Sequence, residues 1–123
     1  MHGDKVKELL STSQLMVFLR ERTDKYRLVV FYHSRCKHCK DFAKAFVGQS
    51  YNIPDDVIMA DINSASQRCA QAFYDHKIPG TPTFIMFNKH GKEHSRHVGS
   101  ILTSEKWNAA LDELKLGNKN KKY

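Results

Sequence analysis

Two cysteines separated by two residues, Cys36 and Cys39, follow closely on a run of apolar residues at positions 28–32. A continuous run of branched and aromatic residues is typical of a strand that is buried on both faces, as in a parallel sheet. From Cys36 onward, helical spacing places one set of apolar residues on a single face, namely Cys39, Phe42, Ala43, Phe46 and Val47. The sequence therefore predicts a strand, a short turn and a helix, with the cysteine pair at the first turn of the helix.

The other elements follow from the same two periodicities. We expect a short edge strand at 6–10 and a helix at 11–22. Ser11 and Gln14 have the spacing of a capping box and mark the start of this helix. A third helix should begin at Ser64, where Ser64 and Gln67 repeat the capping-box spacing, and should bury Cys69. The remaining segments are predicted as a strand at 57–60, a turn at 78–82, a strand at 83–87, a hairpin connection at 88–91, a strand at 94–98 with one exposed face, and a last helix from 103 or 104.

Strands that alternate with helices predict right-handed crossovers, and the final hairpin adds an antiparallel strand to the same sheet. The fold class is therefore α/β, with one central mixed β-sheet flanked by helices on both faces. The 123 residues leave room for one domain, which we place at 1–116. Residues 117–123, with three lysines, are predicted to form a basic flexible C-terminal tail.

The position of the cysteine pair has a chemical consequence. Unpaired N–H groups and the positive end of the helix dipole stabilise a thiolate at the first turn, so we expect the pKa of Cys36 to lie below the value of about 8.5 for free cysteine. Arg35, Lys37 and His38 add positive charge there. Cys39 lies on the apolar face and should be buried, with the higher pKa. Cys36 would then attack a disulfide, and Cys39 would attack Cys36 and release the partner.

A metal site and a purely structural cysteine pair are the alternatives. Zinc usually needs four ligands, and this chain offers one close pair, Cys69 and dispersed histidines. We interpret Cys69 as a buried structural thiol and expect neither a metal nor a cofactor. The order of strand, CxxC and helix within a βαβ unit favours redox chemistry over both alternatives.

A second element, Thr81-Pro82, directly precedes the predicted strand at 83–87. A cis peptide bond at Pro82 would leave the backbone groups of Thr81 unpaired beside the sulfurs, where an extended peptide can dock as an added strand. An ordinary trans proline is the alternative, and by itself the sequence favours it, because only about 5% of X–Pro bonds in folded proteins are cis.

The charge balance is strongly basic, with 20 Lys and Arg against 13 Asp and Glu and a formal net charge of +7. Part of the excess lies in the tail and the rest is scattered, so we expect attraction to acidic partner proteins and no nucleic-acid binding. No apolar run approaches the roughly 18 residues of a membrane span. Residues 1–10 are charged where a signal peptide is apolar. We expect a cytoplasmic protein without membrane association, with an exported or organellar mature form as the alternative.

These features together resemble the thioredoxin superfamily over roughly residues 5–116. The resemblance rests on the strand that leads into the cysteine pair, on the segment 78–83 around Thr81-Pro82, and on Val98-Gly99 before the last helix. It implies the thioredoxin fold, a cis Pro82 packed against the active-site sulfurs, a Thr81 backbone that pairs with the substrate peptide, and a Gly99 region that forms part of the same groove.

The chain also departs from a typical thioredoxin. Arg35 replaces a tryptophan, Lys37 and His38 replace Gly-Pro, and Val30 and Met59 stand where many members have a buried acid and a lysine. The resemblance therefore implies that the usual general base for Cys39 is absent, and His38, water and Asp61 are the candidates to replace it. A histidine before the second cysteine is also similar to protein disulfide isomerases and implies a more oxidising potential.

We expect a monomeric thiol–disulfide oxidoreductase that exchanges a Cys36–Cys39 disulfide or dithiol with protein substrates, as a protein disulfide reductase. Lys37 and His38 would tune the potential, and the docking surface would be formed by Arg35, Thr81, Pro82 and Gly99. Such an enzyme also needs a recycling reductase or oxidase as a partner. The alternatives are an oxidant or isomerase of a more oxidising compartment and a non-enzymatic binding module with the same fold.

Overall fold

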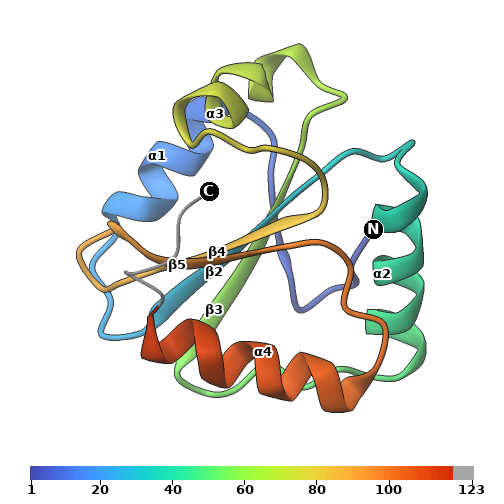
Figure 1. Ribbon diagram of the computed structural model, residues 1–123. Helices are drawn as coiled ribbons and strands as arrows, with labels where there is room; N and C mark the ends of the chain where they lie inside the picture. The colour runs from blue at the N-terminus through green and yellow to red at the C-terminus, as the bar shows by residue number, and fades with distance from the viewer. Residues whose placement is uncertain (118–123) are drawn as a thin grey trace.

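The protein is described by a computed structural model over residues 1–117 (Figure 1), so the predicted tail, apart from Gly117, lies outside the described residues. Five strands in this range form one sheet in the order β1-β3-β2-β4-β5. The first three in that order are parallel to one another, and β4 is antiparallel to β2 and β5. The strands are β1 (Lys7–Leu9), β2 (Tyr26–Tyr32), β3 (Val57–Asn63), β4 (Thr83–Phe87) and β5 (Glu93–Val98).

The sheet is covered by helices on both faces, as Figure 1 shows. The helices are α1 (Thr12–Arg20), α2 (Lys37–Gly48), α3 (Ala70–Asp75) and α4 (Ser104–Leu116). Side chains of α2 and α4 pack on one face of the sheet, and side chains of α1 and α3 pack on the other. The predicted α/β fold with a mixed central sheet is thereby confirmed. No helix within residues 1–117 is long and apolar enough to cross a membrane.

The central position of β2 explains its continuous apolar run. Each residue from Leu28 to Phe31 is completely buried, because β2 has a strand on either side and helices above and below. On the face that carries α2, Phe42 packs against both Phe84 and Trp107, with ring centroids 4.8 and 5.8 Å away. The indole Nε1–H of Trp107 donates to the carbonyl of Asn52 at 2.7 Å. This aromatic cluster holds α2, and with it the cysteine pair, against the sheet.

The prediction that a helix begins at Ser64 was wrong, because α3 begins only at Ala70. The backbone N–H of Ser64 donates to the carbonyl of Tyr32 at 2.8 Å, and Asn63 Oδ1 accepts from the N–H groups of Ser34 and Ala65 at 3.1 and 3.0 Å. These bonds hold the segment as a turn beside the end of β2. A 3₁₀ turn, η1 (Gln67–Cys69), follows it and leads into the short α3.

The prediction of an exposed face for β5 was also wrong. Ser95 and Arg96 are only 1% and 8% exposed, although the strand lies at the edge of the sheet. Ser95 Oγ donates to the carbonyl of Leu114 in α4 at 2.5 Å, and the Arg96 guanidinium donates to the carbonyl of His76 at 2.8 Å. Polar side chains are therefore buried here because both helical layers supply carbonyl acceptors. Val47, assigned to the buried face of α2, is instead 54% exposed at its margin.

Candidate redox site

Cys36 is the N-cap residue of α2, and its thiol is half-buried. Its carbonyl accepts the N–H of Lys40 at 3.0 Å, and its Sγ accepts the N–H of Cys39 at 3.3 Å. The turn before it is held by the N–H of Cys36 on the carbonyl of His33, and by the N–H of Arg35 on His33 Nδ1, both at 3.0 Å. The sulfur thus takes the place of the oxygen of a serine or aspartate cap, where it faces unpaired helix N–H groups.

The pKa of Cys36 is lowered from its ordinary value of 9.0. Burial alone would raise this pKa, but it is outweighed by hydrogen bonds to the thiolate from the side chains of Cys39 and Thr81 and from the backbone N–H groups of Cys39 and His38. The sequence-based expectation of a low pKa is consistent with this direction. A thiolate at this position is a competent nucleophile toward a disulfide.

Cys39 has the opposite environment. Its side chain is 1% exposed and packs in the cluster on the α2 face of the sheet. Burial raises the pKa of Cys39 from 9.0 to about 11, and its hydrogen bond to Cys36 acts in the same direction. The two sulfurs are therefore divided into an accessible thiol that ionises readily and a buried thiol that stays protonated.

The Thr81-Pro82 peptide bond is cis, as the resemblance implied. Cys36 Sγ lies 3.5 Å from the carbonyl oxygen of Thr81, close enough for the thiol to donate to it. The turn is fixed by Thr83 Oγ1, which donates to the carbonyl of Gly80 at 2.6 Å, and by the N–H of Gly99, which donates to the carbonyl of Pro82 at 2.9 Å. Three of the predicted site residues, Thr81, Pro82 and Gly99, are thus brought together next to Cys36, where Thr81 and Gly99 are partly exposed and Pro82 is buried.

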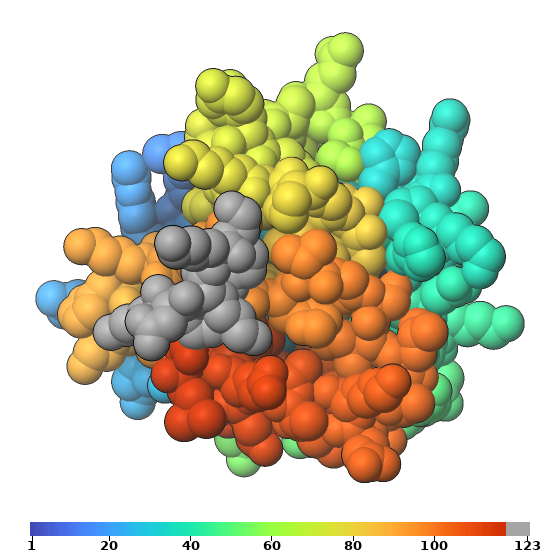
Figure 2. All heavy atoms as spheres, viewed as in Figure 1, coloured from blue at the N-terminus to red at the C-terminus, as the bar shows by residue number. Residues whose placement is uncertain are grey.

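The loop after β5 closes the other side of this surface. Ser100 Oγ donates to the carbonyl of His38 at 2.5 Å, and Gln49 Nε2 donates to the carbonyl of Leu102 at 3.0 Å. In Figure 2 the orange loop accordingly lies against the cyan and green atoms of α2. Val98, at the end of β5, and Leu102, on this loop, are 44% and 48% exposed. Sequence reasoning missed Ser100, because a serine next to a glycine gives no indication of a partner 62 positions away.

Arg35, Lys37 and His38 all lie on the exposed rim of the site. Lys37 Nζ contacts Asp41 Oδ2 at 2.9 Å, one turn along the helix. The causes of the lowered Cys36 pKa include the backbone N–H of His38 but not the Lys37 side chain. The expectation that the side chains of Lys37 and His38 tune the redox potential therefore stays a prediction. The structure identifies Thr81 as a further group that acts on the thiolate.

The positions of the missing buried acid and lysine are filled by Val30 and Met59, which are 0% and 2% exposed. A different buried carboxylate stands opposite Val30 in the neighbouring strand, at Asp61. Its Oδ2 lies 2.6 Å from Nδ1 of His2, and the other polar atom of each side chain is buried without a hydrogen-bond partner among the described residues. Sequence reasoning named Asp61 but missed His2, because nothing in the sequence places the N-terminus over β3.

His2 and Asp61 also influence their surroundings. The imidazole of His2 packs edge-on against Tyr32, with ring centroids 5.0 Å apart. Burial raises the pKa of Tyr32 to about 12, and the charge of Asp61 acts in the same direction. A polar pair is therefore embedded in the aromatic cluster on the same face of the sheet as Cys39.

Cys69 lies in the opposite core cluster and is 1% exposed, as expected of a structural thiol. Its Sγ lies 4.0 Å from the carbonyl oxygen of Leu9 in β1. Within residues 1–117, no three His, Cys, Asp or Glu side chains come together as a set that could bind a metal ion. The three cysteines are thus separated by the sheet into a pair and a single buried thiol.

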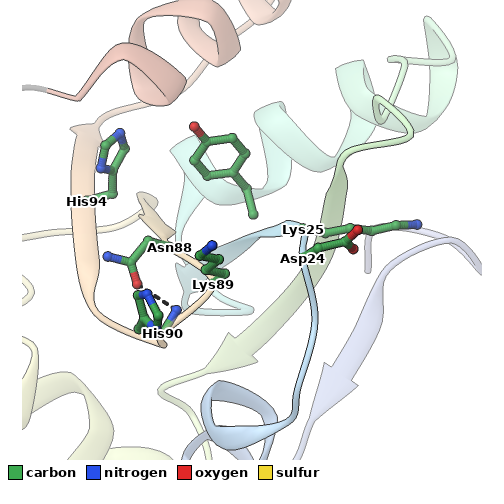
Figure 3. Close-up of a pocket in the computed structure, with 7 residues that line it drawn as sticks. Asp24, Lys25, Asn88, Lys89, His90 and His94 are labelled. Atoms are coloured by element: carbon green, nitrogen blue, oxygen red, sulfur yellow. Dashed lines mark hydrogen bonds between the residues drawn. The ribbon is translucent and has the colours of Figure 1, made fainter.

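A shallow pocket lies at the other end of β2 and β4, away from the cysteine pair. Figure 3 shows its lining residues, Asp24, Lys25, Tyr26, Asn88, Lys89, His90 and His94. Asn88 Oδ1 accepts from the backbone N–H of His90 at 2.9 Å, which is ordinary turn chemistry. The pocket does not contact the residues that surround Cys36.

Comparison with known proteins places this geometry in a family. Solved structures with similar folds include the thioredoxin of Malassezia sympodialis (Mala s 13), with 24% identity, a TM-score of 0.69, and coverage of 91% of this chain and 95% of that one. The thioredoxin of Fasciola hepatica has 18% identity, a TM-score of 0.71 and coverage of 92% and 100%. A Schistosoma mansoni thioredoxin has 20% identity, a TM-score of 0.68 and coverage of 94% and 100%.

A search of curated proteins gave no match to this chain. The sequence model of the family described as Thioredoxin, however, matches residues 8–113. That span contains nearly all of the sheet, the cysteine pair, the cis Pro82 and Gly99, and leaves out only the N-terminal residues, the end of α4 and the tail. With most of its length matched by the family model and with the fold of solved thioredoxins, the chain belongs to the thioredoxin family.

Proposed function

We propose that this protein reduces disulfides in protein substrates by thiol–disulfide exchange at Cys36 and Cys39. The observation that carries the proposal is the opposite environment of the two sulfurs. Cys36 is accessible and has a lowered pKa, whereas Cys39 is buried, one turn away, and has a pKa of about 11. Membership of the thioredoxin family supports the same class of reaction.

In the first step, the Cys36 thiolate attacks one sulfur of the substrate disulfide, forms a mixed disulfide and releases the other sulfur as a thiolate, which takes a proton. In the second step, Cys39 loses its proton and attacks Cys36 Sγ, and the second substrate sulfur leaves as a thiolate. Two electrons have then passed from the cysteine pair to the substrate, and the pair is a disulfide. A reductase that supplies two electrons and two protons must restore the dithiol.

The surface around Cys36 supports a peptide as the substrate. The carbonyl of Thr81 lies next to the sulfur, and Gly99, which follows β5, is bonded to the neighbouring Pro82. An extended chain that pairs with Thr81 would place its cysteine over Cys36. Arg35 is exposed in the turn before α2, and we expect it to contact the same chain.

The decisive assay is reduction of insulin by the reduced protein with dithiothreitol as the electron supply. We expect precipitation of the insulin B chain well before dithiothreitol alone causes it, and no acceleration by a Cys36→Ser variant. A rate equal to that of dithiothreitol alone contradicts the proposal. If Cys36→Ser keeps every cellular function of the protein, the binding-module alternative is favoured.

An oxidant or isomerase is the second candidate, and one observation favours it. The hydrogen bonds that lower the Cys36 pKa stabilise the reduced, thiolate form, and such stabilisation makes a disulfide more oxidising. Equilibration of the Cys36–Cys39 couple with glutathione buffers separates the two candidates. A potential near the value of about −270 mV typical of thioredoxin supports the reductase, and one nearer about −120 to −180 mV supports the oxidant or isomerase.

A further inference from the structure

The surface that surrounds Cys36 is asymmetric in charge. Residues 33–44 contain Arg35, Lys37, Lys40 and Lys44 against the single carboxylate of Asp41, a formal net charge of 4 − 1 = +3 out of +7 for the whole chain. By contrast, the segments 78–83 and 97–103, which form the opposite side of the surface, contain no Asp, Glu, Lys or Arg. The cations are therefore gathered on the α2 side of the nucleophile.

Helical geometry arranges these cations in a row. Lys40 follows Cys36 by four residues and Lys44 follows Lys40 by four, so their side chains lie along one side of α2. Both lysines and Arg35 are exposed, and side chains of the α2 segment project outward at the edge of the molecule in Figure 2. A row from Cys36 to Lys44 spans roughly 12 Å at 1.5 Å per residue.

The one carboxylate in the segment offsets only one of its four positive charges. Asp41 is paired with Lys37 at 2.9 Å, and its pKa is lowered by that hydrogen bond and by the charges of Lys37, His38 and Lys44. The carboxylate therefore stays ionised, and it is directed to Lys37. No Asp or Glu acts on Lys40 or Lys44 through any described ion pair.

We propose that the preferred substrates are protein segments in which acidic residues flank the reactive cysteine. The inference rests on the proposed exchange function and names its substrate class. Glutamate or aspartate side chains within about four residues of the cysteine reach Lys40 and Lys44, because an extended chain advances about 3.3 Å per residue. Apolar residues on the other side of the cysteine contact the exposed Val98 and Leu102. Charge complementarity of this kind acts mainly on the rate of encounter and on the choice of partner.

The test uses three disulfide-linked peptides of equal length that differ only in flanking residues, namely Glu, Gln or Lys. At low salt we expect the Glu peptide to be reduced with a kcat/KM about tenfold above that of the Lys peptide. The ratio should approach one at about 0.5 M salt, because screening then acts over a few ångströms. Equal rates for the Glu and Lys peptides at low salt overturn the inference.

A matched pair of double variants separates the row on α2 from net charge. Lys40→Glu with Lys44→Glu should reduce the preference for the Glu peptide at least fivefold. Lys25→Glu with Lys89→Glu changes the net charge equally at the distant pocket of Figure 3 and should leave the preference within twofold. If both double variants change the preference equally, total charge is responsible and the inference fails.

The Gln peptide distinguishes failure of the inference from failure of the proposed function, since its reduction needs no charge complementarity. If the Gln peptide is not reduced, the exchange function is contradicted and the inference fails with it; if it is reduced and the Glu and Lys peptides react equally, only the inference fails. Alkylation of Cys36, in which the thiolate displaces iodide, measures the effect of the cation row independently. The rate with iodoacetate relative to iodoacetamide should fall in the Lys40/Lys44 variant and not in the Lys25/Lys89 variant. An equal ratio in both variants overturns the inference.

Discussion

The backbone N–H of Cys39 lies 3.3 Å from Cys36 Sγ and donates to it, so the second cysteine helps to ionise the first. The pKa of Cys39 is shifted in the opposite direction, mainly by burial and further by the hydrogen bond between the two thiol side chains. One turn of helix thereby separates an attacking thiol from a resolving thiol. The difference between them arises from position, since both residues are cysteines in the same segment.

The reactivity of Cys36 toward iodoacetamide should rise with pH around a midpoint below that of an unstructured cysteine peptide, because the pKa of Cys36 is lowered. Mass spectrometry of the alkylated protein should find the label at Cys36 and not at the buried Cys39. The matched control is Cys36→Ser, in which Cys39 should react only when the protein is unfolded. Alkylation of Cys36 no faster than that of an unstructured peptide thiol would remove the basis of the redox assignment.

Thr81→Val should raise the pKa of Cys36, because the hydroxyl that hydrogen-bonds to the thiolate is replaced by a methyl group of similar size. Thr81→Ser keeps a hydroxyl and should restore most of the effect. The pH dependence of the thiolate absorbance in the ultraviolet measures both variants. A Cys36 pKa unchanged in Thr81→Val would show that the cis turn contributes only its backbone to the site.

The reduced protein should lose stability as the pH rises above about 9. The pKa of Cys39 is raised to about 11 in the folded state, so the unfolded chain gives up this proton first and alkali favours unfolding. Between pH 9 and 11 the free energy of unfolding should fall by on the order of 1.4 kcal/mol per pH unit, because the folded chain still holds a proton that the unfolded chain has released. Urea unfolding at several pH values should show a smaller decline in Cys39→Ala. Tyr32, whose pKa is raised to about 12, and Tyr51, whose pKa is raised by burial, contribute to the remaining decline.

The buried pair of His2 and Asp61 should be important for stability. His2→Ala leaves the Asp61 carboxylate buried without its partner, and we expect a loss of about 3 kcal/mol in the free energy of unfolding. Lys7→Ala breaks the exposed contact with Glu21 at 4.0 Å and should cost less than about 1 kcal/mol. Similar losses in both variants would mean that the buried pair contributes no more than a surface contact.

Cys69→Ala should leave disulfide exchange unchanged, because Cys69 lies across the sheet from the active pair. Removal of the buried sulfur should lower stability by about 1–2 kcal/mol through the lost packing of one heavy atom. Insulin reduction and thermal unfolding together check the two halves of this expectation. A change in the rate of exchange would assign Cys69 a part in the chemistry.

The sequence by itself determined the elements whose burial has a clear period. The run at 28–32 indicates the central strand, the change to helical spacing at Cys36 indicates α2, and Thr103 begins the last helix through its side chain. These predictions succeed because a strand buried on both faces has a continuous run of apolar residues, whereas a helix buried on one face has apolar residues at every third or fourth position. The cysteine pair and its unequal environments follow from the same local pattern.

Tertiary structure alone decided how polar groups distant in the chain come together. Ser95 and Arg96 lie in a strand expected to have one exposed face, yet both are buried against carbonyls from α4 and from the end of α3. The side chain of Asn63 likewise holds a turn where a helix was predicted to start. His2 meets Asp61 across 59 positions, and Ser100 meets His38 across 62. A hydrogen bond between remote residues has no sequence period, because it depends on where the sheet brings two segments, and only the folded chain fixes that.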